Sequence, residues 1–264
     1  MKHLAIPALL AALLAQAPAV QAASAQASID WSSLTVTVYD LSGGSNAPQL
    51  SWSSEYGTAS AYAVSYGPYT SDGDSMYQSD WGTLLAVDAV VPKASSDASR
   101  SAGLLVAQAA AQTGTHPSSE TSGYIANYGS GHAYNSGGFT VTGQGLVMIT
   151  LAWTLSVQGA QFDYDDYATA YVWIQGSFSD GLFNSGTAQS SYFDQSFVNG
   201  DATHHGTFAM SMYSNGIDPI NGSLSASAGV GAYAVSQPVP EPETYALMLA
   251  GLGLVGWRAR RRRA

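Results

Sequence analysis

No cysteine occurs anywhere in the 264-residue sequence. The chain therefore cannot form a disulfide or bind a metal through a thiolate. Exported domains with a small core commonly depend on disulfides for stability. This chain is long enough to bury a core without them, so the packing of its secondary-structure elements must supply the stability.

Basic side chains are nearly absent from the middle of the chain. Between Ser28 and Pro238 the sequence has two basic residues, Lys93 and Arg100, against 16 acidic ones, a net charge of −14. The whole chain has a net charge of only −10 because the other basic residues lie near its two ends. Such an acidic region repels nucleic acid and anionic lipid headgroups, so we expect neither as a partner. The charge either attracts divalent cations or keeps the protein soluble.

The sequence also lacks the motifs of common hydrolases. It contains neither the G-x-S-x-G turn of a serine hydrolase nor the H-E-x-x-H helix of a zinc protease. His204 and His205 are adjacent, and adjacent side chains on a strand point to opposite faces, so the two cannot both bind one metal. Glu55 and Glu120 are the only glutamates of the central region, so a glycosidase would depend mainly on aspartates. We expect no enzymatic activity, and a matrix hydrolase is an alternative without positive support.

The N-terminus has the features of an export signal. A short polar segment precedes an apolar stretch over residues 4–14, which is too short to span a membrane, and small residues follow. The tripeptides that end at Ala22 and at Ala27 both fit a signal-peptidase site. We assign residues 1–27 to a signal peptide, and we expect the processed chain to begin after one of these two alanines.

Composition and periodicity predict an all-β domain over residues 28–236. Glycine, serine, threonine, tyrosine and valine dominate, and the oppositely charged pairs that stabilise exposed helices are missing. Apolar and polar residues alternate instead at 34–39, 61–66 and 167–175. Many short strands joined by glycine-rich turns predict one antiparallel β-sandwich or jelly roll. Further strands are expected at 84–91, 139–142, 146–157, 190–198, 207–213 and 223–235.

Four features of this domain carry more specific expectations. Residues 94–112 are alanine-rich and fit either a helix or a strand, and we favour the strand. Residues 113–138 are rich in glycine, serine and asparagine, which predicts loops with at most one short strand. The nearly continuous apolar run over 146–157 predicts a strand buried on both faces. Asn-Gly pairs predict hairpin turns at 199–200, 215–216 and 221–222.

Residues 237–264 differ in character from the domain. They contain, in order, a stiff acidic spacer, an apolar run over 244–257 and a basic cluster. An apolar run followed by arginines enters a bilayer and stops there, and about 14 residues is shorter than a stable span. We therefore expect a short transmembrane helix that serves as a temporary anchor. The spacer holds Pro240, Glu241 and Pro242, and the basic cluster consists of Arg258, Arg260, Arg261, Arg262 and Arg263.

This order of parts resembles the PEP-CTERM sorting signal. The resemblance implies that an exosortase in the inner membrane of a Gram-negative bacterium cleaves the chain near the Pro-Glu-Pro motif. The protein would then pass to the cell surface or the extracellular polymer, with signal peptidase and exosortase as its processing partners. The resemblance covers about a tenth of the chain and does not indicate what the exported domain does. An ordinary C-terminal membrane anchor is the alternative.

Two groups of side chains are candidates for ligand binding. Aromatic rings stack on sugar rings, and three of them share one face of a predicted strand, although aromatic residues are also enriched in strands for packing. Aspartates before that strand offer oxygen ligands that suit Ca²⁺, but they do not match the EF-hand pattern and are ordinary turn residues. No cofactor is expected, with calcium as the alternative. The aromatic group is Tyr167, Tyr171 and Trp173, and the acidic group is Asp163, Asp165 and Asp166.

These observations predict a non-enzymatic exported protein that is structural in exopolysaccharide or biofilm. A carbohydrate-binding module that uses the aromatic strand face is the main alternative. An ice-binding adhesin is less favoured, because ice binding needs regular arrays of Thr-x-Thr, and the pairs at 35–37 and 140–142 are isolated.

Overall fold

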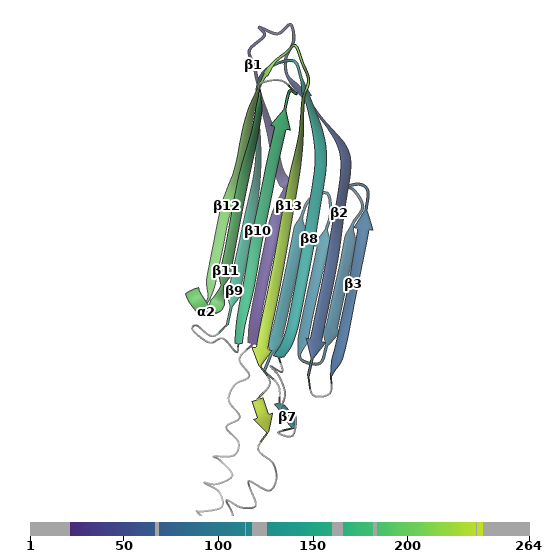
Figure 1. Cartoon of the computed structure of the whole chain (residues 1–264), viewed down its shortest axis with the longest axis vertical. Helices are drawn as coiled ribbons and strands as arrows, with labels where there is room; N and C mark the ends of the chain where they lie inside the picture. The colour runs from purple at the N-terminus through teal and green to yellow at the C-terminus, as the bar shows by residue number, and fades with distance from the viewer. Residues whose placement is uncertain are drawn as a thin grey trace, which may run out of the picture.

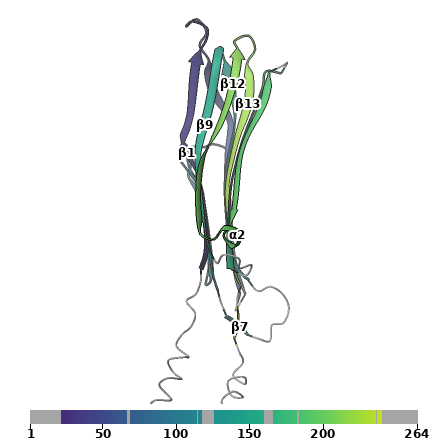
Figure 2. The ribbon, with the colours of Figure 1, turned by 90° about the vertical axis from the view of Figure 1, so that its left-hand side faces the viewer.

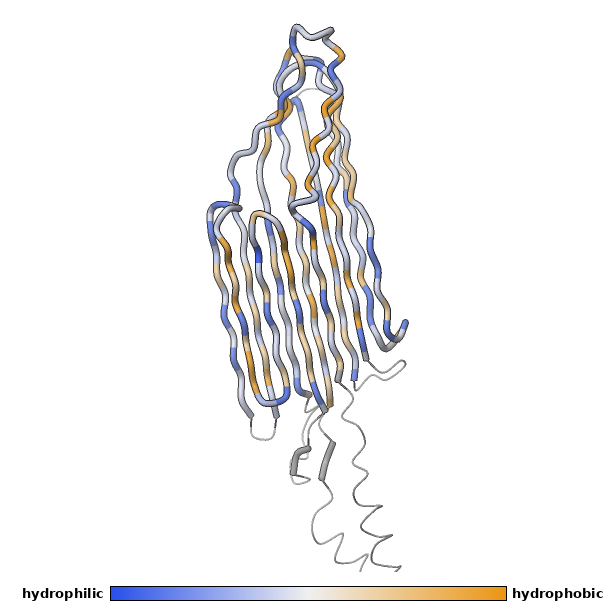
Figure 3. The backbone as a smooth tube through the Cα atoms, turned by 180° about the vertical axis from the view of Figure 1, so that it is seen from behind, coloured by the Kyte–Doolittle hydropathy of each residue, from blue (hydrophilic) through white to orange (hydrophobic). Residues whose placement is uncertain are grey.

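Alternating small apolar and polar residues build long strands through most of the domain. The computed structural model describes residues 22–66, 69–113, 115–117, 126–159, 166–181, 184–235 and 237–239. These residues form two six-stranded antiparallel sheets packed face to face, so the predicted β-sandwich is confirmed. Figure 2 shows the two sheets edge-on as thin layers, and Figure 3 shows the alternation of hydropathy along the strands.

Sheet A contains the N-terminal strand near its middle. Its strand order is β12 (Ala202–Asn215), β9 (Gln144–Gln158), β1 (Ala22–Asp40), β6 (Leu105–Gln112), β5 (Ala94–Arg100) and β4 (Leu85–Val91).

Sheet B faces the viewer in Figure 1. Its strand order is β11 (Ser185–Gln195), β10 (Asp166–Ser179), β13 (Ile220–Val235), β8 (Ala126–Thr142), β2 (Gln49–Ser65) and β3 (Thr70–Gln78). The four-residue helix α2 (Ser196–Asn199) joins β11 to β12, at the edges of the two sheets. Outside the sheets, β7 (Thr115–Pro117) pairs in parallel with β14 (Gln237–Val239).

The core is narrow at one end because small residues fill it. Alanines of β1 and β6 are buried there, and β8 contributes glycines to its inner face. A Cβ atom at Gly129 would lie 2.4 Å from the Ser95 carbonyl oxygen, and one at Gly131 would lie 2.6 Å from that of Asp97. The sheets therefore approach too closely for any side chain at these two positions. Larger side chains fill the rest of the core, including Ile149, Leu151, Ile174, Phe208 and Leu224.

The loop prediction for residues 113–138 is wrong over residues 126–138, and residues 114 and 118–125 lie outside the described residues. Residues 126–142 form β8, one of the longest strands, which pairs with both β13 and β2. Its inner face uses glycine, alanine and asparagine rather than large apolar residues, so hydropathy does not reveal the strand. Glycine is required at Gly129 and Gly131 by the close approach of the sheets, and here it marks packing rather than a turn.

Two other expectations are corrected. In β9, residues from Val147 to Val157 alternate between buried and partly exposed, so only one face is buried. The pair Asn221-Gly222 lies inside β13, not in a turn. The Phe139 ring covers Gly222, where a Cβ atom would lie 2.1 Å from the ring, so glycine serves aromatic packing at this position.

The strand favoured for residues 94–112 is confirmed, because they form no helix but the hairpin β5–β6. Gly200 and Gly216 both have positive φ in the connections that lead into β12 and out of it. The hairpins predicted at these two positions are wrong, because β12 lies in sheet A and its chain neighbours β11 and β13 lie in sheet B. Strand β1 begins at Ala22, so part of the segment assigned to the signal peptide lies within sheet A. The short transmembrane helix expected at 244–257 lies outside the described residues, and no helix within them is long and apolar enough to cross a membrane.

Candidate functional site

The outer face of sheet B carries aromatic and small polar side chains without charged ones. The register aligns five strand segments there, and their outward residues are Tyr, Trp, Phe, His, Ser, Thr, Gln and Gly. No Asp, Glu, Lys or Arg lies among the outward residues of these described segments. We call this surface the aromatic face. Its segments are 56–62 of β2, 128–136 of β8, 225–233 of β13, 167–175 of β10 and 189–195 of β11.

Tyr171 lies near the middle of the aromatic face. Its ring covers Gly229 on the neighbouring strand β13, where a Cβ atom would lie 2.3 Å from Cε1 and Cζ of Tyr171. Phe193 of β11 is opposite Tyr171 on its other side and is 57% exposed. His132 of β8 is opposite Gly229, and its ring centroid is 6.3 Å from that of Tyr171. Three rings thus follow one row across four strands, with a glycine between two of them.

A second row of rings lies near one end of the face. Tyr233 stacks on Tyr167 with ring centroids 4.6 Å apart, and it packs at a tilt of 32° against Tyr128 with centroids 4.5 Å apart. These distances match the spacing of neighbouring strands, so the rings stand against one another across the strands. Burial raises the pKa of the Tyr233 hydroxyl. The faces of these three rings are therefore in contact mainly with one another.

The polar groups of the face are largely paired with one another. His132 Nε2 lies 2.8 Å from Ser227 Oγ, and Ser136 Oγ lies 2.8 Å from Ser225 Oγ. Burial lowers the pKa of His132, which favours the neutral ring. A neutral imidazole keeps the face uncharged at neutral pH.

The structure places the predicted aromatic residues together but gives them different surroundings. Tyr167, Tyr171 and Trp173 all point outward from β10, as the alternation predicts. Tyr167 belongs to the tyrosine row, Tyr171 covers Gly229, and Trp173 lies between Ser191 and Ser227 in register. The sequence alone assigns no binding role to Phe193 or His132. In β8, the sequence pattern that could have indicated an outward face is the recurrence of Tyr, Ser or His at residues 128, 130, 132, 134 and 136.

The predicted acidic group is only partly described. Asp163 and Asp165 lie outside the described residues. Asp166 is buried at the start of β10, and its Oδ1 accepts a hydrogen bond from the Val235 amide at 3.1 Å. Within the described part of the chain, no three His, Asp or Glu side chains are grouped so that they could hold a metal ion. Calcium binding stays a prediction.

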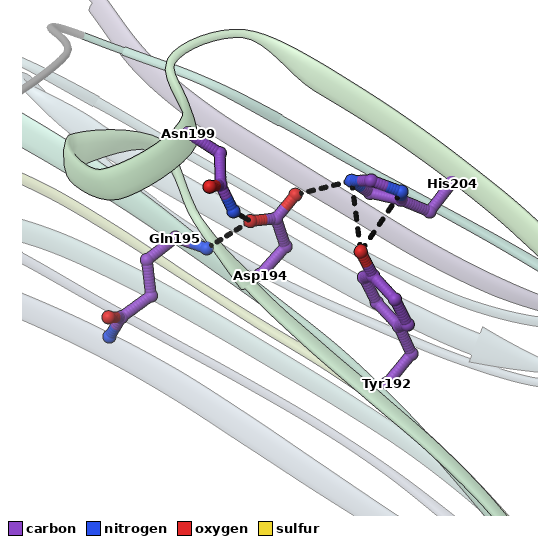
Figure 4. A network of polar contacts seen from close by, with 5 residues as sticks. All are labelled: Tyr192, Asp194, Gln195, Asn199 and His204. Atoms are coloured by element: carbon purple, nitrogen blue, oxygen red, sulfur yellow. Dashed lines mark hydrogen bonds and ion pairs between the residues drawn. The ribbon is translucent and has the colours of Figure 1, made fainter.

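A polar network that the sequence analysis missed links the edges of the two sheets (Figure 4). Asp194 of β11 is fully buried, and its Oδ2 lies 2.8 Å from His204 Nε2 of β12. The other carboxylate oxygen, Oδ1, accepts hydrogen bonds from the Gln195 amide at 2.8 Å and from Asn199 of α2. The Tyr192 hydroxyl lies 3.1 Å from His204 Nδ1. These residues come from consecutive elements, so the network fixes the connection between β11 and β12.

The histidine pair behaves as its position on a strand predicts. His204 points inward to the network, and His205 is exposed on the other face of β12. The two rings therefore do not share a site. The network joins two sheet edges through a buried carboxylate, which suits a structural role.

The outer face of sheet A is polar and acidic, in contrast to the aromatic face. It holds a shallow cavity of about 350 Å³ lined by Ser24, Gln26, Ser95, Asp97, Gln108 and Ser156 among others. Asp97 is directly opposite Asp88 of β4. Burial, and then the negative charge of Asp88, raise the pKa of Asp97. Two like charges on paired strands disfavour the fold rather than support it.

Comparison with known families concerns the C-terminal tail, whose motif and arginines lie outside the described residues. The family model of the PEP-CTERM protein-sorting motif matches residues 238–263. The chain ends in a PEP-CTERM motif. The matched range includes the predicted Pro240-Glu241-Pro242 and the arginines from Arg258 to Arg263. No curated protein matches the chain.

The PEP-CTERM motif implies an exported cell-surface protein that an exosortase processes. This confirms the predicted sorting signal. The motif describes the route of the protein, so the role of the sandwich must be argued from its own surfaces.

Proposed function

We propose that the processed domain is a non-enzymatic structural protein of the extracellular polymer and that the aromatic face contacts the polymer. The observation that carries this proposal is the contrast between the face and the rest of the domain. A domain with a net charge of −14 over residues 28–238 has one broad sheet face without charged side chains. Aromatic rings and hydroxyl groups on a flat surface suit polysaccharide, which offers C–H groups and hydroxyls.

The route to the polymer is part of the proposal. Signal peptidase removes the N-terminal segment, and the apolar run over 244–257 then holds the chain in the inner membrane of a Gram-negative bacterium. The arginines after this run resist transfer across the bilayer. Exosortase cleavage near Pro240-Glu241-Pro242 releases the domain. The insertion is transient because the run is shorter than a stable span.

Fractionation of the producing bacterium tests the proposed function. Cells, extracellular polymer and medium are separated, and the protein is quantified in each, in the parent strain and in a strain that makes no polymer. The proposal predicts that the protein is mainly in the polymer fraction and moves to the medium when polymer synthesis is disrupted. An unchanged distribution in the two strains contradicts it.

A carbohydrate-binding protein without a structural role is the second candidate, supported by the same aromatic face. The two differ in what happens to the polymer when the protein is removed. A structural role predicts that deletion of the gene weakens the polymer in rheometry. A purely binding role predicts unchanged mechanics, with loss of protein from the polymer as the only effect.

A further inference from the structure

We infer that the aromatic face binds an uncharged polysaccharide chain by stacking a sugar ring on Tyr171. This inference rests on the proposed function and names the ligand class and the contact residues. It begins from the position of the Tyr171 ring over Gly229. A ring that lies across a glycine packs one face on the sheet, and its opposite face is the surface a pyranose can stack on. Because any Cβ atom at position 229 would collide with the ring, the glycine fixes this geometry.

The neighbours of Tyr171 extend the platform across the strands. Phe193 is next to Tyr171 in register, and its side chain is 57% exposed. On the other side, Gly229 has no side chain, and His132 follows on β8. Neighbouring strands are about 4.8 Å apart, so this row spans the length of several sugar units. A polysaccharide chain that runs across the strands can therefore contact rings from β11, β10 and β8.

Polar side chains line both sides of this row. In register, Thr169 is next to Gln195 on one side of the row, and Trp173 is next to the exposed Ser191 on the other. Hydroxyl and amide groups at such positions can donate to and accept from sugar hydroxyls. Ring stacking with flanking polar groups is the usual composition of a small-molecule site, here laid out on a flat sheet.

Charge selects the class of polysaccharide. The described segments of the aromatic face contain no acidic or basic residue, and the domain is strongly acidic. Arg100, one of the two basic residues between Ser28 and Pro238, is fully buried and donates to the Asp80 carbonyl, so it offers no surface charge. A uronic-acid or sulfated polymer would be repelled and would find no cation on the face. An uncharged polysaccharide is not repelled by the acidic domain and needs no cation on the face.

Affinity electrophoresis of the processed protein, purified from the producing culture, tests this inference. The gels contain hydroxyethylcellulose, galactomannan or dextran as uncharged polymers, and alginate as the acidic one. We expect retardation by at least one uncharged polymer and none by alginate. Tyr171→Ala and Phe193→Ala should each weaken the retarding interaction about tenfold, which is about 1.4 kcal/mol, because each removes one ring contact with the sugar.

Two further variants separate stacking from a general effect on the sheet. Tyr213→Ala removes a tyrosine that is 46% exposed on the outer face of sheet A, and it should leave retardation unchanged. Gly229→Ala should weaken binding because the new methyl group displaces the Tyr171 ring. In the double variant Tyr171→Ala/Gly229→Ala the ring is absent, so the second substitution should add nothing. Circular dichroism confirms that each variant keeps its sheets.

The outcomes distinguish this inference from the proposed function. Polymer association in culture that survives Tyr171→Ala and Phe193→Ala overturns the platform and leaves the matrix role standing. Equal retardation by alginate, or none by any uncharged polymer, overturns the ligand class. If the unmodified protein does not associate with the polymer in culture, the proposed function itself is overturned.

Discussion

His204 Nε2 lies 2.8 Å from the buried carboxylate of Asp194 and so links the edge of sheet A to the edge of sheet B. The side chain of Asp194 is fully buried, and that of His204 is 33% exposed. Strands β11 and β12 are separated only by α2, so this contact closes a short connection between the layers. A carboxylate in this position depends on its partners for the solvation it has lost.

We predict that His204→Ala destabilises the domain by about 1–3 kcal/mol, because it leaves Asp194 buried with one partner fewer. His205→Ala is the matched control, since its side chain is exposed on the opposite face. Urea unfolding followed by tryptophan fluorescence measures both. Equal midpoints for the two variants would show that the network contributes nothing to stability.

Asp97→Asn should stabilise the domain by about 0.2–1 kcal/mol, because it removes a like charge directly opposite Asp88. The raised pKa of Asp97 means that the folded state binds this proton more tightly than the unfolded state. The penalty is therefore present at neutral pH and is relieved as the pH falls through the raised pKa.

The measurement compares unfolding of Asp97→Asn and the unmodified protein at neutral and acidic pH. The gain should be present at pH 7 and should shrink in acid. Asp88→Asn relieves the same repulsion, so the double variant should gain less than the sum of the two. Strict additivity of the two substitutions would contradict the account.

His132 should make the fold less stable in mild acid. Burial lowers the pKa of His132, so in mild acid the unfolded chain binds a proton at this residue more readily than the folded one. The free energy of unfolding is therefore undiminished above the ordinary histidine pKa of about 6.5 and decreases as the pH falls below it. His132→Gln should remove this part of the pH dependence between pH 7 and pH 5. Thermal unfolding over that range measures it, and a profile that the substitution leaves unchanged would exclude His132 as the titrating group.

Strand β1 predicts where signal peptidase cuts. Ala23, Ala25 and Ala27 are buried, and residues 24–27 pair with β6 on one side and β9 on the other. Cleavage after Ala27 would remove these pairs from the middle of sheet A, whereas cleavage after Ala22 keeps them. N-terminal sequencing of the processed protein should therefore read from Ala23, and a start at Ser28 would contradict this prediction.

The sequence predicted the aromatic side of β10 because a period of two places Tyr171 and Trp173 together on any strand. It could not predict that Tyr171 covers Gly229, because that contact depends on the register between strands distant in sequence. It missed β8 because Gly129 and Gly131 look like loop residues, although they are there to let the sheets approach. The Asp194–His204 contact was hidden for the same reason as the Gly229 contact, since nothing in the sequence indicates which sheet edges meet.

The intact mass of the protein in the polymer fraction of the producing bacterium tests the central claim most directly. We expect one species that begins at Ala23 and ends near Pro240, with the apolar run and the arginines removed. Its presence there would show that the released sandwich is the form that acts in the polymer. A mass that includes the chain through Arg263, found only in the inner membrane, would contradict both the release and the matrix role.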